Sequence, residues 1–151
     1  MMIDPAYIRQ RAERTGSLRV SVDVRSQTDE ATGTDNTAIE ITRVLPTSDA
    51  PAFASALLGD SITVTESQHW GPSSGAGCRA TMEAAFGTLV RLQASITLTD
   101  TEGGCLAVTS STCRASVPLI GGKVEALVEQ QVRDYLGYEV SLAADWLAAH
   151  S

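Results

Sequence analysis

The sequence predicts an α+β domain in which helices cover one face of an antiparallel sheet. Between residues 18 and 117, apolar and polar side chains alternate in short segments that glycine- and proline-containing spacers separate, as in strands and turns. From Lys123 to His150 the chain has no proline, and apolar residues recur every three or four positions, which is typical of a helix. That helix would be about 40 Å long. The only preceding surface broad enough to carry it is a sheet.

The first elements are a short helix and a hairpin. Asp4 and Pro5 open a helix that Gly16 closes. Residues 18–24 then alternate between apolar and polar side chains, which predicts a strand with one solvated face. A second strand around residues 39–41 follows a polar loop, so we expect the two strands to pair.

A second helix and four further strands fill the middle of the chain. Ser48 or Asp49 is expected to cap a short helix that has Pro51 in its first turn and ends at Gly59. The period-two pattern then predicts strands at residues 62–70, 78–86, 89–98 and 105–117.

The passage from the last strand into the long helix has its own signals. Pro118 ends the strand because proline cannot donate to a ladder. Gly121 and Gly122 tolerate positive φ, so we expect the backbone to swing there.

Composition indicates one domain, residues 1–151, with a substantial core: 43% of the residues are hydrophobic and 19% are charged. The net charge of −7 is spread along the chain and no window gathers Lys and Arg, so nucleic acid is not an expected partner. The N-terminus lacks a signal-peptide pattern, and no stretch approaches the roughly 20 apolar residues of a membrane span. We therefore expect a cytoplasmic protein.

The cysteines and histidines indicate neither a disulfide framework nor a metal centre. Cys78, Cys105 and Cys113 are odd in number and have no zinc-like spacing, so we expect three small, buried, reduced side chains. His69 and His150 are too few for a multi-histidine site. No nucleophile-elbow or phosphate-loop motif is present. We expect no metal and no cofactor, and we assign no catalytic residue.

The order of elements resembles the START-like, or SRPBCC, superfamily, the Bet v 1-like helix-grip proteins in which a curved antiparallel sheet wraps a long C-terminal helix. Four segments carry a narrower similarity: Asp4-Pro5-Ala6-Tyr7-Ile8-Arg9, Arg43-Val44-Leu45-Pro46, Thr63-Val64-Thr65-Glu66 with Trp70, and Val117-Pro118-Leu119-Ile120-Gly121-Gly122-Lys123-Val124-Glu125. Through them, nearly the whole chain is similar to an actinobacterial family described as domain of unknown function 2505. The Pro-Leu-Ile-Gly-Gly-Lys piece is the most specific.

Members of that family usually begin with a further strand and helix, whereas this chain opens at what would be their second helix. Either the given start is internal and the preceding residues are absent, or the protein truly lacks them. The resemblance therefore implies a START-like domain that is truncated at its N-terminus, with about six strands and short helices near the N-terminus and between strands two and three. Such a truncation leaves a sheet edge unpaired. Because unpaired edges promote strand pairing between subunits, a homodimer through this edge is a further hypothesis.

The superfamily resemblance also implies a cavity between sheet and long helix for a hydrophobic or amphipathic small molecule, such as a lipid. Small side chains at alternate positions of the strands at 78–86 and 105–117 support it. Alternatively, they let helix and sheet approach closely, so that backbone fills the space. By strand parity and helix face, the cavity candidates are Ile41, Val64, Glu66, Gln68, Ala80, Met82, Ala84, Leu92, Ala94, Thr109, Ser111, Cys113, Tyr135, Tyr138 and Leu142.

The polar candidates have two interpretations each. An unbroken strand points Glu66 and Gln68 inward, where a carboxylate needs a partner. A bulge or the open end of the sheet would instead let them reach water. Tyr135 and Tyr138 offer hydroxyl groups to a ligand, or they form ordinary core hydrogen bonds.

Three functions remain open. The first is non-enzymatic binding of a hydrophobic small molecule between sheet and helix, which we favour. The second, found among superfamily relatives, is a cyclase- or aromatase-like enzyme that moves protons with Glu66, His69 or a tyrosine. The third is a dimeric interaction module whose groove is filled.

Overall fold

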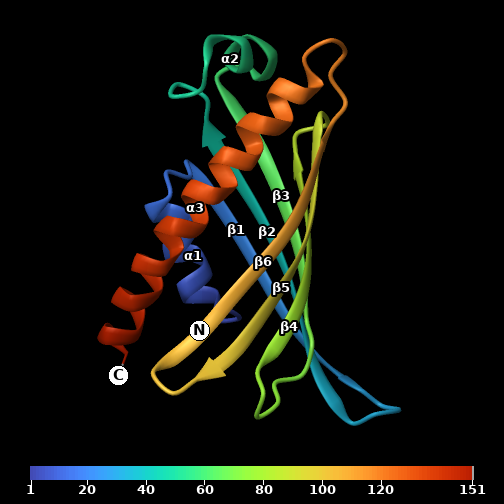
Figure 1. Ribbon diagram of the computed structural model, residues 1–151, viewed down its shortest axis with the longest axis vertical. Helices are drawn as coiled ribbons and strands as arrows, with labels where there is room; N and C mark the ends of the chain where they lie inside the picture. The colour runs from blue at the N-terminus through green and yellow to red at the C-terminus, as the bar shows by residue number, and fades with distance from the viewer. Residues whose placement is uncertain (151) are drawn as a thin grey trace.

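A computed structural model describes residues 1–150 and has the predicted α+β architecture. Six strands form one antiparallel sheet in the order β1-β2-β3-β4-β5-β6, so each strand pairs with its neighbour in sequence. Helices pack against this sheet and against one of its ends (Figure 1). In chain order the elements are α1 (Pro5–Arg14), β1 (Arg19–Asp29), β2 (Thr34–Pro46), α2 (Ala52–Leu58), β3 (Ser61–Trp70), β4 (Cys78–Phe86), β5 (Val90–Thr101), β6 (Gly104–Ala115) and α3 (Gly121–Ala149).

The helices α1 and α3 pack on the same face of the sheet, which we call the inner face. Ile8 of α1 belongs to a buried cluster with Ile39 and Ile41 of β2. Val124 of α3 belongs to a second buried cluster with Cys113 of β6. Figure 1 shows α3 crossing the sheet diagonally, with its C-terminal half beside α1. The prediction that helices lie on one face is therefore confirmed.

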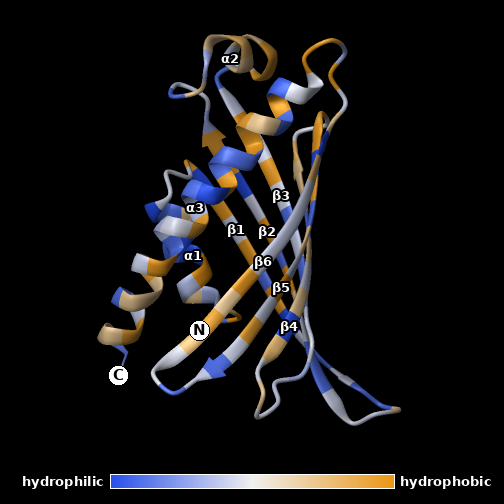
Figure 2. Ribbon diagram, in the orientation of Figure 1, coloured by the Kyte–Doolittle hydropathy of each residue, from blue (hydrophilic) through white to orange (hydrophobic). Residues whose placement is uncertain are grey.

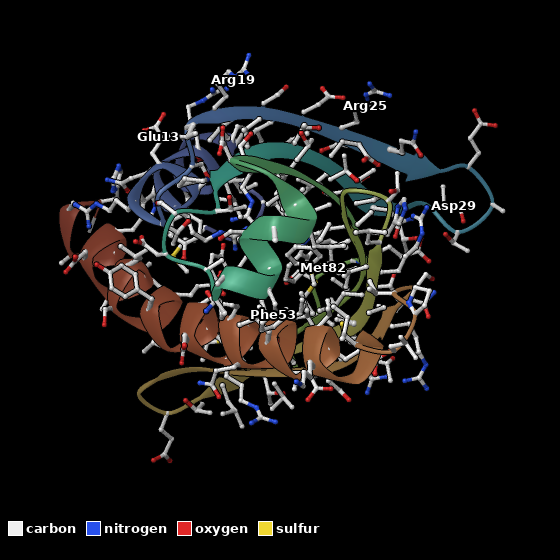
Figure 3. All side chains as sticks on the ribbon, turned by 90° about the horizontal axis from the view of Figure 1, so that it is seen from above. Glu13, Arg19, Arg25, Asp29, Phe53 and Met82 are labelled. Carbon is white, nitrogen blue, oxygen red and sulfur yellow. The ribbon has the colours of Figure 1, made fainter. Side chains whose placement is uncertain are left out.

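Side chains alternate between the two faces of the sheet as the sequence pattern predicts. In β3, Val64 and Trp70 point inward and are only 1% and 3% exposed. Figure 2 shows the corresponding alternation of hydrophobic and hydrophilic residues along the strands. In the view from above (Figure 3), Arg19 and Arg25 of β1 point away from α3, whereas Met82 of β4 lies between the sheet and α3.

The two short helices begin differently. Asp4 caps α1 as predicted, because its Oδ1 accepts hydrogen bonds from the backbone N–H groups of Ala6 at 2.8 Å and Tyr7 at 3.3 Å. The predicted Ser48 or Asp49 cap of α2 is wrong. Helix α2 starts at Ala52, too far along the chain for either side chain to cap it, and the residue before it makes no side-chain cap.

The turn between β6 and α3 also differs from the prediction. Gly121 and Gly122 are the first residues of α3, and the positive φ of 69° lies at Leu119, which is fully exposed. Gly121 is required for a different reason. A Cβ at this position would lie 3.2 Å from the backbone oxygen of Ala115, so the glycine lets the helix start close to the end of β6.

The thiols differ from one another in burial. Cys113 is buried, Cys78 is half-buried and Cys105 is exposed, and all three are free. The prediction of three buried thiols is therefore wrong at Cys105, because it lies at the uncovered start of an edge strand. Among the helices of residues 1–150, none combines the length and hydrophobicity that a membrane-spanning segment needs.

Candidate functional site on the inner face of the sheet

The strand register brings the candidate residues of all the strands onto the inner face. Each row runs across neighbouring strands, so its members point to the same side. The central row contains Ile41, Glu66, Ala84, Leu92 and Cys113. The next row contains Gln68, Met82, Ala94 and Ser111. Trp70, Ala80, Ile96 and Thr109 form the third, and Arg43, Val64, Phe86 and Val90 form the row on the other side.

A chain of hydrogen bonds runs along β3 between the two hydrophobic clusters. Trp70 Nε1 donates to Gln68 Oε1 at 2.7 Å, and Gln68 Nε2 donates to Glu66 Oε1. Glu66 is 8% exposed and Gln68 is 3% exposed. The alternative in which these two side chains reach water is therefore wrong: β3 runs unbroken, and each side chain finds a polar partner two residues along the strand.

Arg43 of β2 faces this chain, and it was not among the predicted candidates. Its side chain is 11% exposed, and its Nη2 lies 3.8 Å from Glu66 Oε2. Its guanidinium carbon also lies 5.4 Å from the centroid of the Tyr135 ring of α3. The signal that identifies it in the sequence is parity, since Arg43 alternates in step with the buried Ile39 and Ile41.

Charged and aromatic side-chain pairs connect α1 to the second half of α3. Arg11 Nη1 donates to Glu139 Oε1, and Arg11 is only 6% exposed. The guanidinium of Arg11 also lies 5.8 Å from the Tyr135 ring, so Arg11 and Arg43 both contact that ring. Sequence reasoning missed Arg11 and Glu139, which are 128 residues apart.

Burial in this region raises the pKa of two tyrosine hydroxyls above its ordinary value. Burial raises the pKa of Tyr135 to about 12, and it does so although Arg11 and Arg43 lower it. Burial also raises the pKa of Tyr7, and Glu139 raises it further. Burial lowers the pKa of Arg11, but Tyr135 and the nearby carboxylates outweigh burial and raise it overall. Tyr135 is therefore a hydrogen-bond donor at neutral pH.

The remaining predicted helix residues behave differently from one another. Leu142 is buried, whereas Tyr138 is 57% exposed. Residues 135, 139, 142 and 146 follow the three-or-four spacing of one helix face, and Tyr138 lies one residue off that row. Of the two tyrosine candidates, the structure brings only Tyr135 to the buried polar residues.

Part of the inner face remains accessible to solvent. Beyond the contact of Val124 with Cys113, α3 runs towards α1 and away from β6. Inward-pointing side chains of the last three strands are left only partly covered, and we call them the open inner surface. They are Met82, Ala94, Leu98, Ala107, Thr109 and Ser111.

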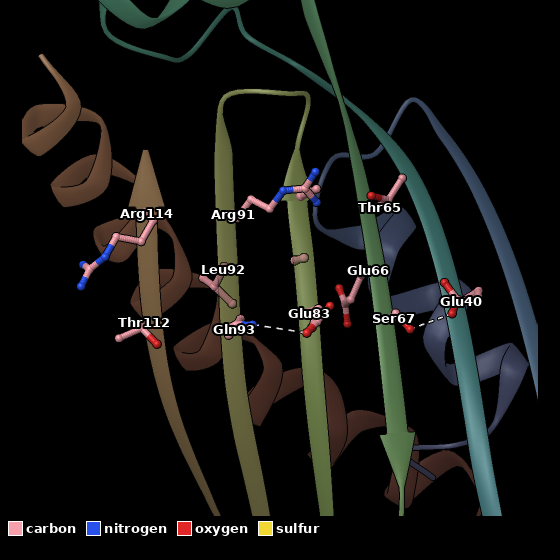
Figure 4. A pocket seen from close by; sticks show the side chains of 12 residues that line it. Glu40, Thr65, Glu66, Ser67, Glu83, Arg91, Leu92, Gln93, Thr112 and Arg114 are labelled. Atoms are coloured by element: carbon pink, nitrogen blue, oxygen red, sulfur yellow. Dashed lines mark hydrogen bonds between the residues drawn. The ribbon is translucent and has the colours of Figure 1, made fainter. Parts of the chain in front are cut away.

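The outer face of the sheet carries a polar pocket of about 370 Å³ (Figure 4). Glu66 also lines this pocket, and the other two lining glutamates have partners: Ser67 Oγ donates to Glu40 Oε1 at 2.7 Å, and Gln93 Nε2 donates to Glu83 Oε1 at 3.3 Å. Those side chains are exposed or half-exposed, whereas Glu66 and Gln68 are buried on the inner face. The inner face is therefore the better candidate site, because burial strengthens electrostatic recognition.

Of the proton-moving residues considered for an enzyme, His69 lies apart from Glu66 and Tyr135, which both neighbour Arg43. His69 pairs with Thr81 of β4 and points to the outer face, while Glu66 points inward. The two side chains therefore lie on opposite sides of the sheet and cannot act on one substrate.

Comparison with known proteins gives one match. The model of a family described as a protein of unknown function (DUF2505) matches residues 1–147. No curated protein and no solved structure matches the chain.

Proposed function

Because the chain belongs to the DUF2505 family, whose description names no activity, we propose a function from the inner face of the sheet. The protein binds a hydrophobic or amphipathic small molecule, such as a lipid, between the sheet and α3. One observation carries this proposal. The open inner surface leaves Met82, Ala94 and Leu98 partly accessible on the face that α1 and α3 otherwise cover.

Two physical arguments support it. Burying apolar surface is favourable by about 25 cal/mol per Å², so the binding free energy of a ligand on this surface becomes more favourable as more apolar area is covered. Small-molecule sites are mostly apolar with a few polar groups that fix orientation, and the buried chain from Trp70 to Glu66 borders the open inner surface. The resemblance to START-like proteins favours the same location, as an analogy at the level of the fold.

A neutral apolar probe, Nile red, tests the proposal. The wild-type protein is expected to raise the fluorescence of the probe in a saturable way. Ala94→Leu fills the inner face and should weaken probe binding by about tenfold, while Ser95→Leu, its neighbour on the outer face, should leave it unchanged. Thermal melting checks that both variants fold.

Two results of this experiment would count against the proposal. Absence of binding by the wild type would refute the proposal, as would equal loss of binding in both variants. Native mass spectrometry before and after organic extraction gives an independent reading, because a carrier that retains its ligand shows an extra mass that extraction removes.

A specific feature of β6 supports a second candidate function, pairing with another copy of the chain. Residues 105–113 carry no charged side chain, and Leu106 and Val108 are 56% and 54% exposed. Edge strands usually avoid such pairing by carrying charge. The other edge strand, β1, does so with Arg19, Asp23 and Arg25.

A lysine on the edge tests this second function. Val108→Lys is expected to convert a dimer into a monomer in light scattering, whereas Ser21→Lys on β1 is expected to leave the dimer intact. A wild-type monomer, or a dimer that persists in Val108→Lys, would show that β6 does not pair.

A further inference from the structure

Arg43 carries more hydrogen-bonding capacity than its surroundings use. A guanidinium has five N–H donors, and buried charges are normally both paired and hydrogen-bonded. Within residues 1–150, the side chain of Arg43 donates no hydrogen bond, and its Nε is fully buried without a partner. Its nearest carboxylate oxygen, on Glu66, is 3.8 Å away, well beyond the separation of about 2.8 Å in a direct arginine–carboxylate bond.

The neighbouring arginine shows the contrast. Arg11 contacts the same Tyr135 ring, but it donates directly to Glu139. Both guanidinium groups that contact Tyr135 have a buried Nε without a partner, but among the described residues only Arg43 makes no side-chain hydrogen bond at all.

The hydrogen-bond chain on β3 explains why Glu66 does not satisfy Arg43. One carboxylate oxygen of Glu66 accepts from Gln68, and Gln68 is itself held by Trp70. A carboxylate held by one oxygen presents only the other to the guanidinium, so the fork-to-fork pairing that arginine favours is not made. The guanidinium of Arg43 therefore keeps unused N–H donors for an additional oxyanion.

Further donors belong to residues that follow Arg43 in a series of ring contacts: Tyr135 contacts both arginines, and Arg11 also lies 5.8 Å from the centroid of the Tyr7 ring. Tyr135 keeps its proton at neutral pH. The hydroxyl of Tyr7 and the Nε of Arg11 are buried and have no hydrogen-bond partner in the described residues. Because a buried polar atom without a partner is costly, a ligand oxygen or a bound water that meets these donors is favoured.

We propose that Arg43, with Tyr135, recognises an anionic head group, such as a carboxylate, on the amphipathic ligand of the inner face. This inference rests on the proposed function, and it further specifies that the ligand is negatively charged. The apolar part of the ligand extends from Arg43 on β2 across the strands to Ala94 on β5. These positions lie three strands apart and, because Arg43 is in register with Val90, four residues apart along β5. At about 4.8 Å per strand and about 3.3 Å per residue the separation is roughly 19 Å, so the ligand is a long-chain or multi-ring acid rather than a small metabolite.

Two ligands with the same chain test the head group. Dodecanoate and dodecanol each compete with Nile red for the protein. Because a hydrogen bond to a charged group stabilises a complex more than a neutral one, we expect the dissociation constant of wild type for dodecanoate to be at least about tenfold lower than that for dodecanol. A double variant, Arg43→Gln with Glu66→Gln, removes both charges without leaving one unpaired, and it should bind the two ligands alike.

Two further variants serve as controls. Arg43→Lys keeps the positive charge but loses the two parallel N–H donors of the guanidinium, so it should retain part of the preference for dodecanoate. It remains informative if the double variant does not fold. Arg91→Gln removes an arginine from the outer pocket and should leave the preference intact.

Each remaining outcome refutes a defined statement. If neither ligand displaces Nile red and the probe itself does not bind, the proposed function is wrong, and this inference is wrong with it. If both ligands bind wild type equally, only the anionic head group is wrong. If the preference survives in the double variant, or disappears in Arg91→Gln, the head group is recognised elsewhere.

Discussion

The ring of Trp146 in α3 meets the ring of Tyr7 in α1 edge to face, with centroids 5.5 Å apart and an interplanar angle of 69°. This pair packs the C-terminal end of the 29-residue helix α3, the far end, against α1. At the N-terminal end, the near end, Val124 packs with Cys113 on the sheet. Between these ends α3 passes over the buried polar residues, so the two attachments determine where Tyr135 lies.

Replacing Trp146 should loosen only the far end of α3. Trp146→Ala removes the contact with Tyr7, and we expect the free energy of unfolding to fall by about 2 kcal/mol, less than for a fully buried tryptophan. Hydrogen exchange should accelerate in the second half of α3 and stay slow around Val124. An equal acceleration along the whole helix would contradict the two-attachment description. His150→Ala, which removes only the ring stacked on Trp146, is the control.

The two ion pairs between α1 and α3 should differ in energy. Glu139→Gln leaves the buried Arg11 without its carboxylate, and we expect the free energy of unfolding to fall by about 3 kcal/mol. Asp145→Asn breaks the pair with Arg14, whose side chains are 68% and 48% exposed, and should cost less than about 0.5 kcal/mol. Urea unfolding of both variants measures the difference. Equal costs would show that burial does not distinguish the pairs.

Gln68 should matter far more than a comparable surface glutamine. Gln68→Leu leaves both Trp70 Nε1 and Glu66 Oε1 without their partner, and we expect a loss of about 2–4 kcal/mol, from two buried polar atoms. Gln93→Leu removes the exposed bond to Glu83 and should cost under about 0.5 kcal/mol. Chemical unfolding gives both values, and tryptophan fluorescence reports the changed surroundings of Trp70.

Local patterns were sufficient to predict most of the fold. The alternation of apolar residues predicted every strand, and β4 has the predicted bounds, Cys78–Phe86. Strand parity also put Glu66 and Gln68 on the inner face, because side chains in an unbroken strand alternate strictly. The alternation does not tell whether these two side chains are buried or reach water. That depends on their partners, since Trp70 donates to Gln68 and Arg43 lies near Glu66.

The rest of the candidate site depends on contacts that are distant in sequence. Arg11 and Glu139 are 128 residues apart, and each taken alone resembles an ordinary surface residue of an amphipathic helix. Their burial follows from the packing of α1 against α3. The strained position at Leu119 was missed for a related reason: glycine is the usual residue at positive φ, so the sequence pointed to Gly121 instead.

Leu119 offers a way to stabilise the protein. A non-glycine residue at a φ of 69° costs about 1–2 kcal/mol, and this leucine is fully exposed, so it gains nothing from burial. Leu119→Gly removes that strain but adds freedom to the unfolded chain, and we expect a net gain of about 0.5 kcal/mol. Leu18→Gly, at an exposed leucine without positive φ, should lower the melting temperature. A lower melting temperature for Leu119→Gly would be the contrary result.

Alkaline titration should reveal the environment of Tyr135. Its pKa is raised from 10.0 to about 12, so the folded protein holds this proton more tightly than the unfolded chain does. The contribution to the free energy of unfolding is complete below pH 10 and is lost as the pH rises from about 10 to about 12. In Tyr135→Phe this loss should be smaller, whereas Tyr138→Phe, at a 57% exposed position, should follow wild type. Ultraviolet absorbance of tyrosinate, recorded with chemical unfolding at each pH, measures both quantities. Identical pH dependence in wild type and Tyr135→Phe would mean that burial does not raise the pKa of this hydroxyl.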